Sequence, residues 1–117
     1  MKFNDTMAIY IQIMDIIKIN IINGEFSIGS QLPSMRKMAN DLNVNQNTMM
    51  RVYNELEYLQ LIYTKTGVGT FVINDINMRE SLKNEMTKEL VSNYVSKMKI
   101  LGFYESDMIM AVKNYKG

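Results

Sequence analysis

The feature that most constrains the fold is a pair of short helical patterns, residues 35–42 and about residues 45–59, with only a few residues between them. In each pattern the apolar residues recur at steps of three and four, which gives an amphipathic helix one buried face. Ser34 precedes the first helix as a capping residue, and Asn43 follows it as a left-handed stop. Two helices joined by so short a turn predict a helix-turn-helix.

A predicted β-hairpin follows this unit directly. Residues 61–65 and 70–73 favour strands, and Gly67 and Gly69 lie in the loop between them, where positive φ angles are needed. The loop has no third glycine and no helix opens after it, so a turn is favoured over a phosphate-binding loop. A helix-turn-helix with a glycine-tipped hairpin is a winged helix. Its second helix suits the major groove of DNA, and its wing reaches the neighbouring backbone or minor groove.

The segment before this unit is predicted as a mostly apolar helix over residues 7–23, ended by Gly24. Polar side chains interrupt it at short intervals, so it is too short and too polar to cross a bilayer. It also lacks the basic start and small-residue exit of a cleavable signal peptide. We therefore expect a cytoplasmic protein without a membrane partner.

The last part of the chain is predicted to form two helices after a linker at residues 74–77. The first covers residues 78–101 and is ended by Gly102, and the second covers about residues 105–115. Two helices alone have no second layer to cover their apolar stripe, so we expect a homodimer. The residues predicted at its interface are Leu82, Met86, Leu90, Tyr94, Val95, Met98, Met108 and Val112.

Together these patterns predict a mostly α fold with a small β-hairpin. Residues 1–74 are expected to form a winged helix-turn-helix DNA-binding domain, and residues 75–117 a short helical unit for dimerisation and any effector. A chain of 117 residues has room for one such domain and one small attached unit. Its tail is too small to enclose a sizeable pocket, so an effector site would lie at a dimer or domain junction.

Composition narrows the chemistry. The chain has no cysteine and no histidine, which excludes thiol nucleophiles, imidazole bases and Cys/His zinc sites. Its acidic residues form no cluster in the sequence that would suggest a metal site, so we expect no metal. Without these catalytic groups we also expect no enzyme and no cofactor. The net charge is only +1, but residues 32–51 carry Arg36, Lys37 and Arg51 against Asp41, a local charge of +2. Any DNA binding must therefore come from local placement of charge.

Five sequence blocks resemble the DNA-binding domain of the GntR family of bacterial transcription regulators. They occupy residues 9–18, 29–36, 43–48, 51–57 and 67–72, and the resemblance covers about residues 7–73. The short tail resembles the small YtrA-type subfamily, whose C-terminal unit serves dimerisation. The resemblance implies a sequence-specific regulator, most often a repressor, that binds a pseudo-palindromic operator as a homodimer. It also implies a target among transporter genes.

The family resemblance assigns DNA contacts residue by residue. Arg36 matches the arginine of the Leu-Pro-Ser-x-Arg block, which contacts phosphate or a base edge. Amides that open the recognition helix suit adenine, and a hydroxyl there suits phosphate. The predicted DNA-binding residues are Ser34, Arg36, Asn45, Gln46, Asn47, Thr48, Arg51, Lys65, Gly67 and Gly69.

Two positions depart from the family pattern. Gln60 stands where the family usually has the glycine that ends the recognition helix, and the wing reads Lys65-Thr66 where paired basic residues are common. Losing one basic residue removes one phosphate contact.

Structural alternatives remain open for the proposed contacts. Arg36 also fits a surface ion pair, Arg51 also fits a pair with Glu55, and residues 45–48 also fit a plain helix cap. The near-neutral charge leaves one alternative function, a winged-helix protein-interaction module without specific DNA binding. A salt titration separates the two functions, because DNA binding weakens steeply with salt.

Overall fold

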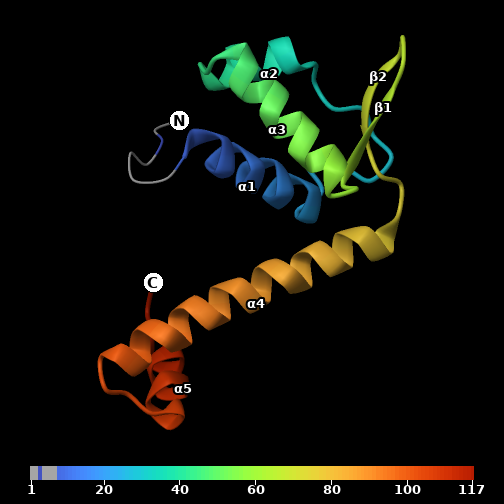
Figure 1. Cartoon of the computed structure of the whole chain (residues 1–117). Helices are drawn as coiled ribbons and strands as arrows, with labels where there is room; N and C mark the ends of the chain where they lie inside the picture. Colours follow the sequence, from blue (N-terminus) through green and yellow to red (C-terminus); the bar gives the residue numbers. More distant parts are fainter. Residues whose placement is uncertain (1–2, 4–7) are drawn as a thin grey trace. The chain divides into compact units, whose positions relative to one another are not determined.

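The computed structural model describes residue 3 and residues 8–117, and within them it is mostly helical with one antiparallel hairpin (Figure 1). The predicted fold class is confirmed. The elements follow in the order α1 (Ile9–Ile22), α2 (Met35–Leu42), α3 (Gln46–Tyr58), β1 (Ile62–Lys65), β2 (Gly69–Val72), α4 (Ile76–Ile100) and α5 (Glu105–Asn114). The chain divides into two compact units, Met1–Leu82 and Lys83–Gly117.

The division falls about two turns inside α4, later than the linker predicted at residues 74–77. Leu82, predicted at the dimer interface, belongs to the first unit and is only 4% exposed in the single chain. Leu82 and Met108, which is 5% exposed, therefore have little surface left for a partner in the single chain, and their place in the interface stays a prediction. The other predicted interface residues lie in the second unit.

The core of the first unit is closed by α1, α2, α3 and the inner face of the hairpin. Helix α1 contributes Ile13, Ile17 and Ile21, all fully buried, because residues three to four apart share one helix face. Ile62 and Val72 lie opposite each other in the hairpin register and are both buried. The remaining buried residues of α2 and α3 are Met38, Ala39, Met49, Val52, Tyr53 and Leu56.

The turn of the helix-turn-helix is built by local capping. Ser34 Oγ accepts a hydrogen bond from the Lys37 amide at 3.1 Å, so the predicted cap is confirmed. Asn43 ends α2 in the left-handed conformation, with φ at 54°. Asn45 then caps α3, because its side-chain oxygen accepts from the Asn47 amide at 2.7 Å.

The segment before α2 pairs with β2 through an isolated antiparallel bridge, which the sequence patterns did not predict. The Leu32 amide donates to Thr70 O at 2.8 Å, and the Val72 amide donates to Ser30 O at 2.9 Å. Gln31 pairs with Phe71 in the same antiparallel sense. Leu32 precedes Pro33, and a residue before proline favours extended backbone.

Small differences occur at the element ends. Helix α1 begins at Ile9, and Met7, where the helix was predicted to start, lies outside the described residues. Both strands begin one residue away from the predicted positions. Gln60, which replaces the expected glycine, takes a left-handed φ of 62°. The backbone there therefore keeps the conformation that favours glycine.

The second unit consists of the later turns of α4 packed against α5. The Tyr94 hydroxyl donates to Met108 O at 2.8 Å, and Met108 is buried, with 5% of its surface exposed. Asp107 accepts from the Tyr104 amide at 2.9 Å and so stabilises the start of α5. Leu90 and Val112 remain 69% and 64% exposed. The unit therefore does not cover its own apolar surface.

Candidate nucleic-acid interface

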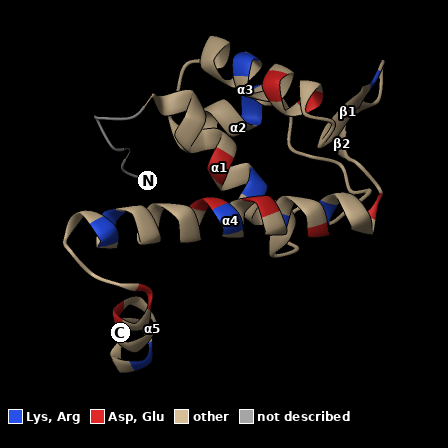
Figure 2. Ribbon diagram, turned by 60° about the horizontal axis from the view of Figure 1, so that its bottom comes forward, with Lys and Arg blue, Asp and Glu red and all other residues tan. Residues whose placement is uncertain are grey.

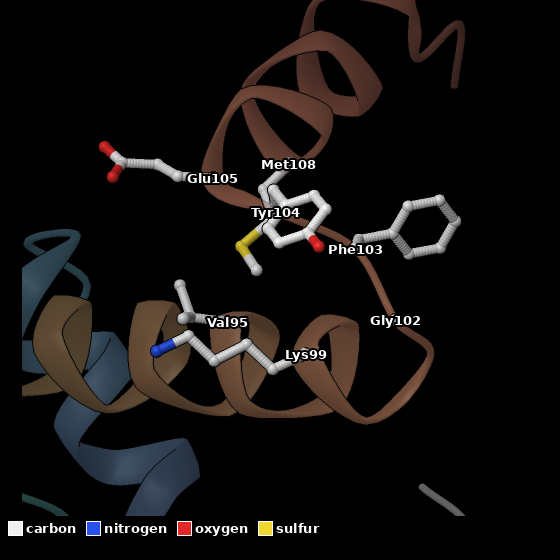
Figure 3. A pocket seen from close by; sticks show the side chains of 7 residues that line it. All are labelled: Val95, Lys99, Gly102, Phe103, Tyr104, Glu105 and Met108. Atoms are coloured by element: carbon white, nitrogen blue, oxygen red, sulfur yellow. The ribbon is translucent and has the colours of Figure 1, made fainter.

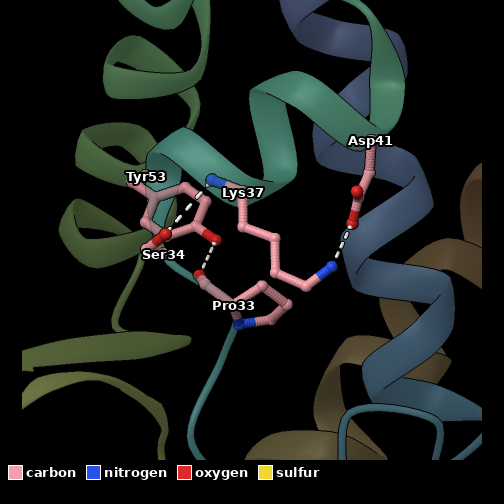
Figure 4. A network of polar contacts seen from close by, with 5 residues as sticks. All are labelled: Pro33, Ser34, Lys37, Asp41 and Tyr53. Atoms are coloured by element: carbon pink, nitrogen blue, oxygen red, sulfur yellow. Dashed lines mark hydrogen bonds and ion pairs between the residues drawn. The ribbon is translucent and has the colours of Figure 1, made fainter.

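The start of α2 presents one unpaired cation beside a paired one. Lys37 forms an ion pair with Asp41 at 2.9 Å, one helical turn further along (Figure 4). Arg36 is exposed, and among the described residues it forms no ion pair. The surface ion pair considered for Arg36 is therefore not formed. Its guanidinium is available for an anion.

Tyr53 fixes the position of this helix start. Its hydroxyl donates to Pro33 O at 2.6 Å, which joins α3 to the residues that lead into α2 (Figure 4). Tyr53 is 4% exposed, and its burial raises the pKa of the phenol to about 12. Tyr53 is therefore part of the core.

The start of α3 exposes amide side chains in a row. Gln46 and Asn47 are exposed and Thr48 is half-buried, whereas the Asn45 side-chain oxygen is occupied by the cap. An amide has both a donor and an acceptor, so Gln46 and Asn47 have the groups that read adenine in the major groove. A helix cap and exposed amide side chains therefore coexist in this segment.

Arg51 is held by an aromatic ring from α1. Its guanidinium carbon lies 3.6 Å from the centroid of the Tyr10 ring. Glu55 forms no ion pair with it among the described residues, so the predicted alternative partner is replaced by Tyr10. A stacked guanidinium keeps its N–H edges for hydrogen bonding, so this contact orients Arg51 without using its donors.

The wing tip carries Lys65 and the two glycines. Lys65 ends β1 opposite Gly69 and is exposed. Gly67 has a φ of 77°, and a Cβ built on it meets no atom of residue 3 or residues 8–117 within 4 Å. Gly69 has a φ of 149°, and a Cβ there would collide with the side-chain amide nitrogen of Gln31. The two glycines are thus needed for different reasons.

Charge outside this surface is mixed in sign. Figure 2 shows both basic and acidic positions along α4, and the last turn of the helix carries Lys97 and Lys99. Among the described residues there is no group of three or more acidic side chains placed to hold a metal ion. In the same part of the chain no helix combines the length and apolar character that a membrane span requires.

This arrangement of a helix-turn-helix with an adjoining wing defines a winged-helix DNA-binding protein. Residues 9–72 match the family described as bacterial regulatory proteins, gntR family. The chain belongs to the GntR family, and its relatives include YtrA-type regulators.

Three similar proteins show how far the likeness extends. The HTH-type transcriptional regulator YhcF of Bacillus subtilis is 35% identical over 97% of this chain and 94% of its own length. The HTH-type transcriptional repressor YtrA of the same organism is 31% identical over 71% of this chain and 68% of its own. A solved GntR family transcriptional regulator from Listeria monocytogenes is 37% identical. Its TM-score is 0.93, with 97% of this chain and 100% of that chain covered.

Sequence reasoning missed two residues that support this surface. Gln31 and Tyr10 both lie in blocks that resemble the family, residues 29–36 and 9–18, but neither is among the predicted site residues. No periodic pattern marks either contact, because each joins segments far apart in the chain. An extended stretch before Pro33 was the one local signal that residues near Gln31 could pair with a strand.

Proposed function

We propose that this chain is a homodimeric repressor that binds a pseudo-palindromic operator through its winged helix-turn-helix. The observation that carries the DNA-binding surface is the contrast at α2, where Lys37 is paired and the adjacent Arg36 is left without an ion pair among the described residues. DNA phosphates or a guanine edge provide the matching acceptors.

The proposed DNA contacts come from three segments of the first unit. Ser34 and Arg36 contact DNA from α2, residues 45–48 and Arg51 from α3, and the wing from residues 65–69. The amide side chains of α3 read base edges, while the cations bind phosphates and fix the register. Gly67 lets the backbone approach the phosphates, because no side chain extends from the tip there.

The second unit supports the proposed dimer. Its exposed apolar residues flank a groove of about 610 Å³ between the last turns of α4 and the start of α5, with Val95, Phe103 and Met108 on its walls (Figure 3). A second copy of the chain would cover this surface. In a two-fold dimer the two recognition helices reach half-sites one DNA turn apart, roughly 34 Å.

We place any effector site at the junction of this dimer, because the groove within one chain is open. The YtrA-type resemblance supports transporter genes as the regulated target. The relatives are transcription regulators, and we assign this chain no catalytic activity.

The DNA-binding proposal is tested by selecting duplexes from a random-sequence library with the full-length protein. We expect an enriched inverted repeat, and an affinity that falls steeply between about 50 and 200 mM salt. Enrichment of no sequence, with an affinity that salt does not change, would contradict operator binding and favour the protein-interaction alternative.

The dimer is tested separately with two variants of α4 that add the same charge. Leu90→Glu places a carboxylate on the exposed apolar surface, and Ser92→Glu places one at an exposed polar position on the same helix. Sedimentation should show a dimer for the wild-type chain and for Ser92→Glu, and dissociation for Leu90→Glu. A monomeric wild-type chain at micromolar concentration would exclude the proposed dimer.

A further inference from the structure

The side chain of Gln31 reaches the tip of the wing from the segment that leads into α2. Its Nε2 donates to Val68 O at 3.2 Å, and the two residues are 37 positions apart in the chain. Gln31 pairs with Phe71, so its side chain lies on the same sheet face as the stacked rings of Tyr63 and Phe71. From there the Gln31 side chain passes over Gly69, through the space that a side chain at this residue would occupy.

Gly69 provides the space that this crossing needs. A Cβ on Gly69 would collide with Gln31 Nε2 and would lie 3.2 Å from Gln31 Cδ. Gly67, two residues earlier, has open space around it. Both glycines have a positive φ, which disfavours a side chain, but of the two only Gly69 would also bring a Cβ against another side chain among the described residues.

The segment that carries Gln31 is firmly anchored on the side toward α2. Leu32 is buried and its amide bonds to Thr70 O, and the next residue, Pro33, accepts the hydrogen bond from Tyr53. Ser34, the next residue, and Arg36 begin the proposed DNA contacts of α2. Gln31 thus joins the wing tip to a segment whose position is already set.

We propose that Gln31 is a positioning residue that holds the wing tip in register with the start of α2, so that Lys65 and Arg36 engage one stretch of DNA together. This inference rests on the proposed DNA-binding surface. A wing tip held before binding loses less conformational freedom when it meets DNA, and the difference appears as affinity. Because Gln31 is exposed, its hydrogen bond adds little to folding stability.

The test combines Gln31→Met with Lys65→Ala in a double-mutant cycle on the full-length protein. Methionine keeps the length of the side chain but has no N–H to donate. The probe is a duplex selected by the wild-type protein from a random-sequence library. Affinity, its dependence on salt and the thermal melting temperature are measured for each variant.

We expect Gln31→Met to weaken binding about tenfold and to lower the salt slope by about one, with the melting temperature unchanged. Lys65→Ala should have the same effect in the wild-type protein and almost none in the Gln31→Met protein, because the lysine is then no longer held against DNA. Arg36→Ala should lower affinity equally in both backgrounds.

Gly69→Ala is a second way to remove the hydrogen bond between the Gln31 side chain and Val68 O. Gly67→Ala is its matched control. Gly69→Ala displaces the Gln31 amide, so combining it with Gln31→Met should add less than the two separate losses in affinity. Gly67→Ala brings a similar strain from a positive φ but should remain additive with Gln31→Met, because none of the described residues has an atom within 4 Å of its Cβ.

The outcomes distinguish a failure of the positioning role of Gln31 from a failure of the proposed DNA-binding surface. If Lys65→Ala and Arg36→Ala leave wild-type binding unchanged, the DNA-binding surface itself is wrong. If both weaken binding but Lys65→Ala and Gln31→Met are fully additive, or if Gln31→Met changes melting and not the salt slope, the positioning role of Gln31 is overturned.

Discussion

The first unit, Met1–Leu82, buries the side chains of Ile17, Leu56 and Val72 completely, whereas in residues 83–117, all of which the structure describes, Met108 alone is buried. The first unit has three helices, a hairpin and the start of α4, and its elements cover one another on several sides. The second has part of α4 and all of α5, and two helices leave their outer faces uncovered. A closed core supports a fixed DNA-facing surface, and an open pair of helices is suited to joining a second chain.

The largest effect is expected for the stability of the first unit. It is tested with two leucines of α4 that lie on opposite sides of the boundary between the units, Leu82 and Leu90. Leu82→Ala should lower the free energy of unfolding of the first unit by about 2–5 kcal/mol, because Leu82 is 4% exposed. Leu90→Ala, at a position 69% exposed in the single chain, should leave that unit's stability unchanged and weaken dimerisation. Chemical denaturation at several protein concentrations distinguishes the two effects. If both variants lowered the free energy of unfolding of the first unit equally, the boundary between the two units at Leu82 would be wrong.

The next effect separates DNA contact from dimerisation. Arg36→Ala should weaken operator binding by about 1–3 kcal/mol without changing the melting temperature or the sedimentation of the protein. Lys37→Ala removes the same charge from the adjacent position, but this lysine is engaged with Asp41. We expect a smaller loss of affinity for it in the same titration. Comparable losses for both variants would indicate a general charge effect and no specific contact by Arg36.

A smaller effect tests how α3 holds the start of α2. Tyr53→Phe removes the donor to Pro33 O and should lower the free energy of unfolding by about 1–2 kcal/mol. Burial raises the pKa of Tyr53 from 10.0 to about 12, so the folded protein favours the neutral phenol. The stability that this adds is complete below pH 10 and is lost as the pH rises toward 12.

Denaturation curves measured across that pH range check the prediction. The wild-type protein should lose more stability than Tyr53→Phe over the same interval. Identical pH profiles for the two proteins would show that this phenol titrates alike in the folded and unfolded chain.

The smallest effect concerns the residue that ends the recognition helix. Gln60 has a positive φ, so Gln60→Gly should raise the free energy of unfolding of the first unit by about 0.5–1 kcal/mol. Gln46→Gly, in the first turn of α3, should lower it, because glycine loses more backbone entropy in a helix. Thermal melting of the two variants shows directly whether each substitution raises or lowers the stability of the first unit. A lower melting temperature for Gln60→Gly would mean that the glutamine side chain contributes more than the backbone strain costs.

The elements were predictable where neighbouring residues define them. Helix α2 was placed from Met35 to Leu42, because the cap at Ser34 and the left-handed stop at Asn43 act on the residues beside them. The glycines of the wing and the end of α4 near Gly102 follow from the same local preferences. The Leu-Pro-Ser-x-Arg block likewise marks Arg36 through residues that lie beside it in the sequence.

The contacts that support the site were not predictable in this way. Arg51 had a plausible partner four residues away, but its guanidinium stacks on Tyr10, which lies in another helix. Leu82 fitted the apolar stripe of α4 as well as Leu90 did, and periodicity alone does not tell which of two such leucines is buried by its own unit.

The sequence by itself determined the order of the elements, the family and the residues at the two helix starts, because caps, glycines and apolar periodicity act over a few residues. Only the tertiary structure decided that Gln31 reaches Val68, that Tyr53 fixes Pro33 and that Leu82 belongs to the first unit. These depend on which distant surfaces meet when the core closes. Contacts between distant segments depend on how side chains pack in three dimensions, and no short stretch of sequence predicts that packing.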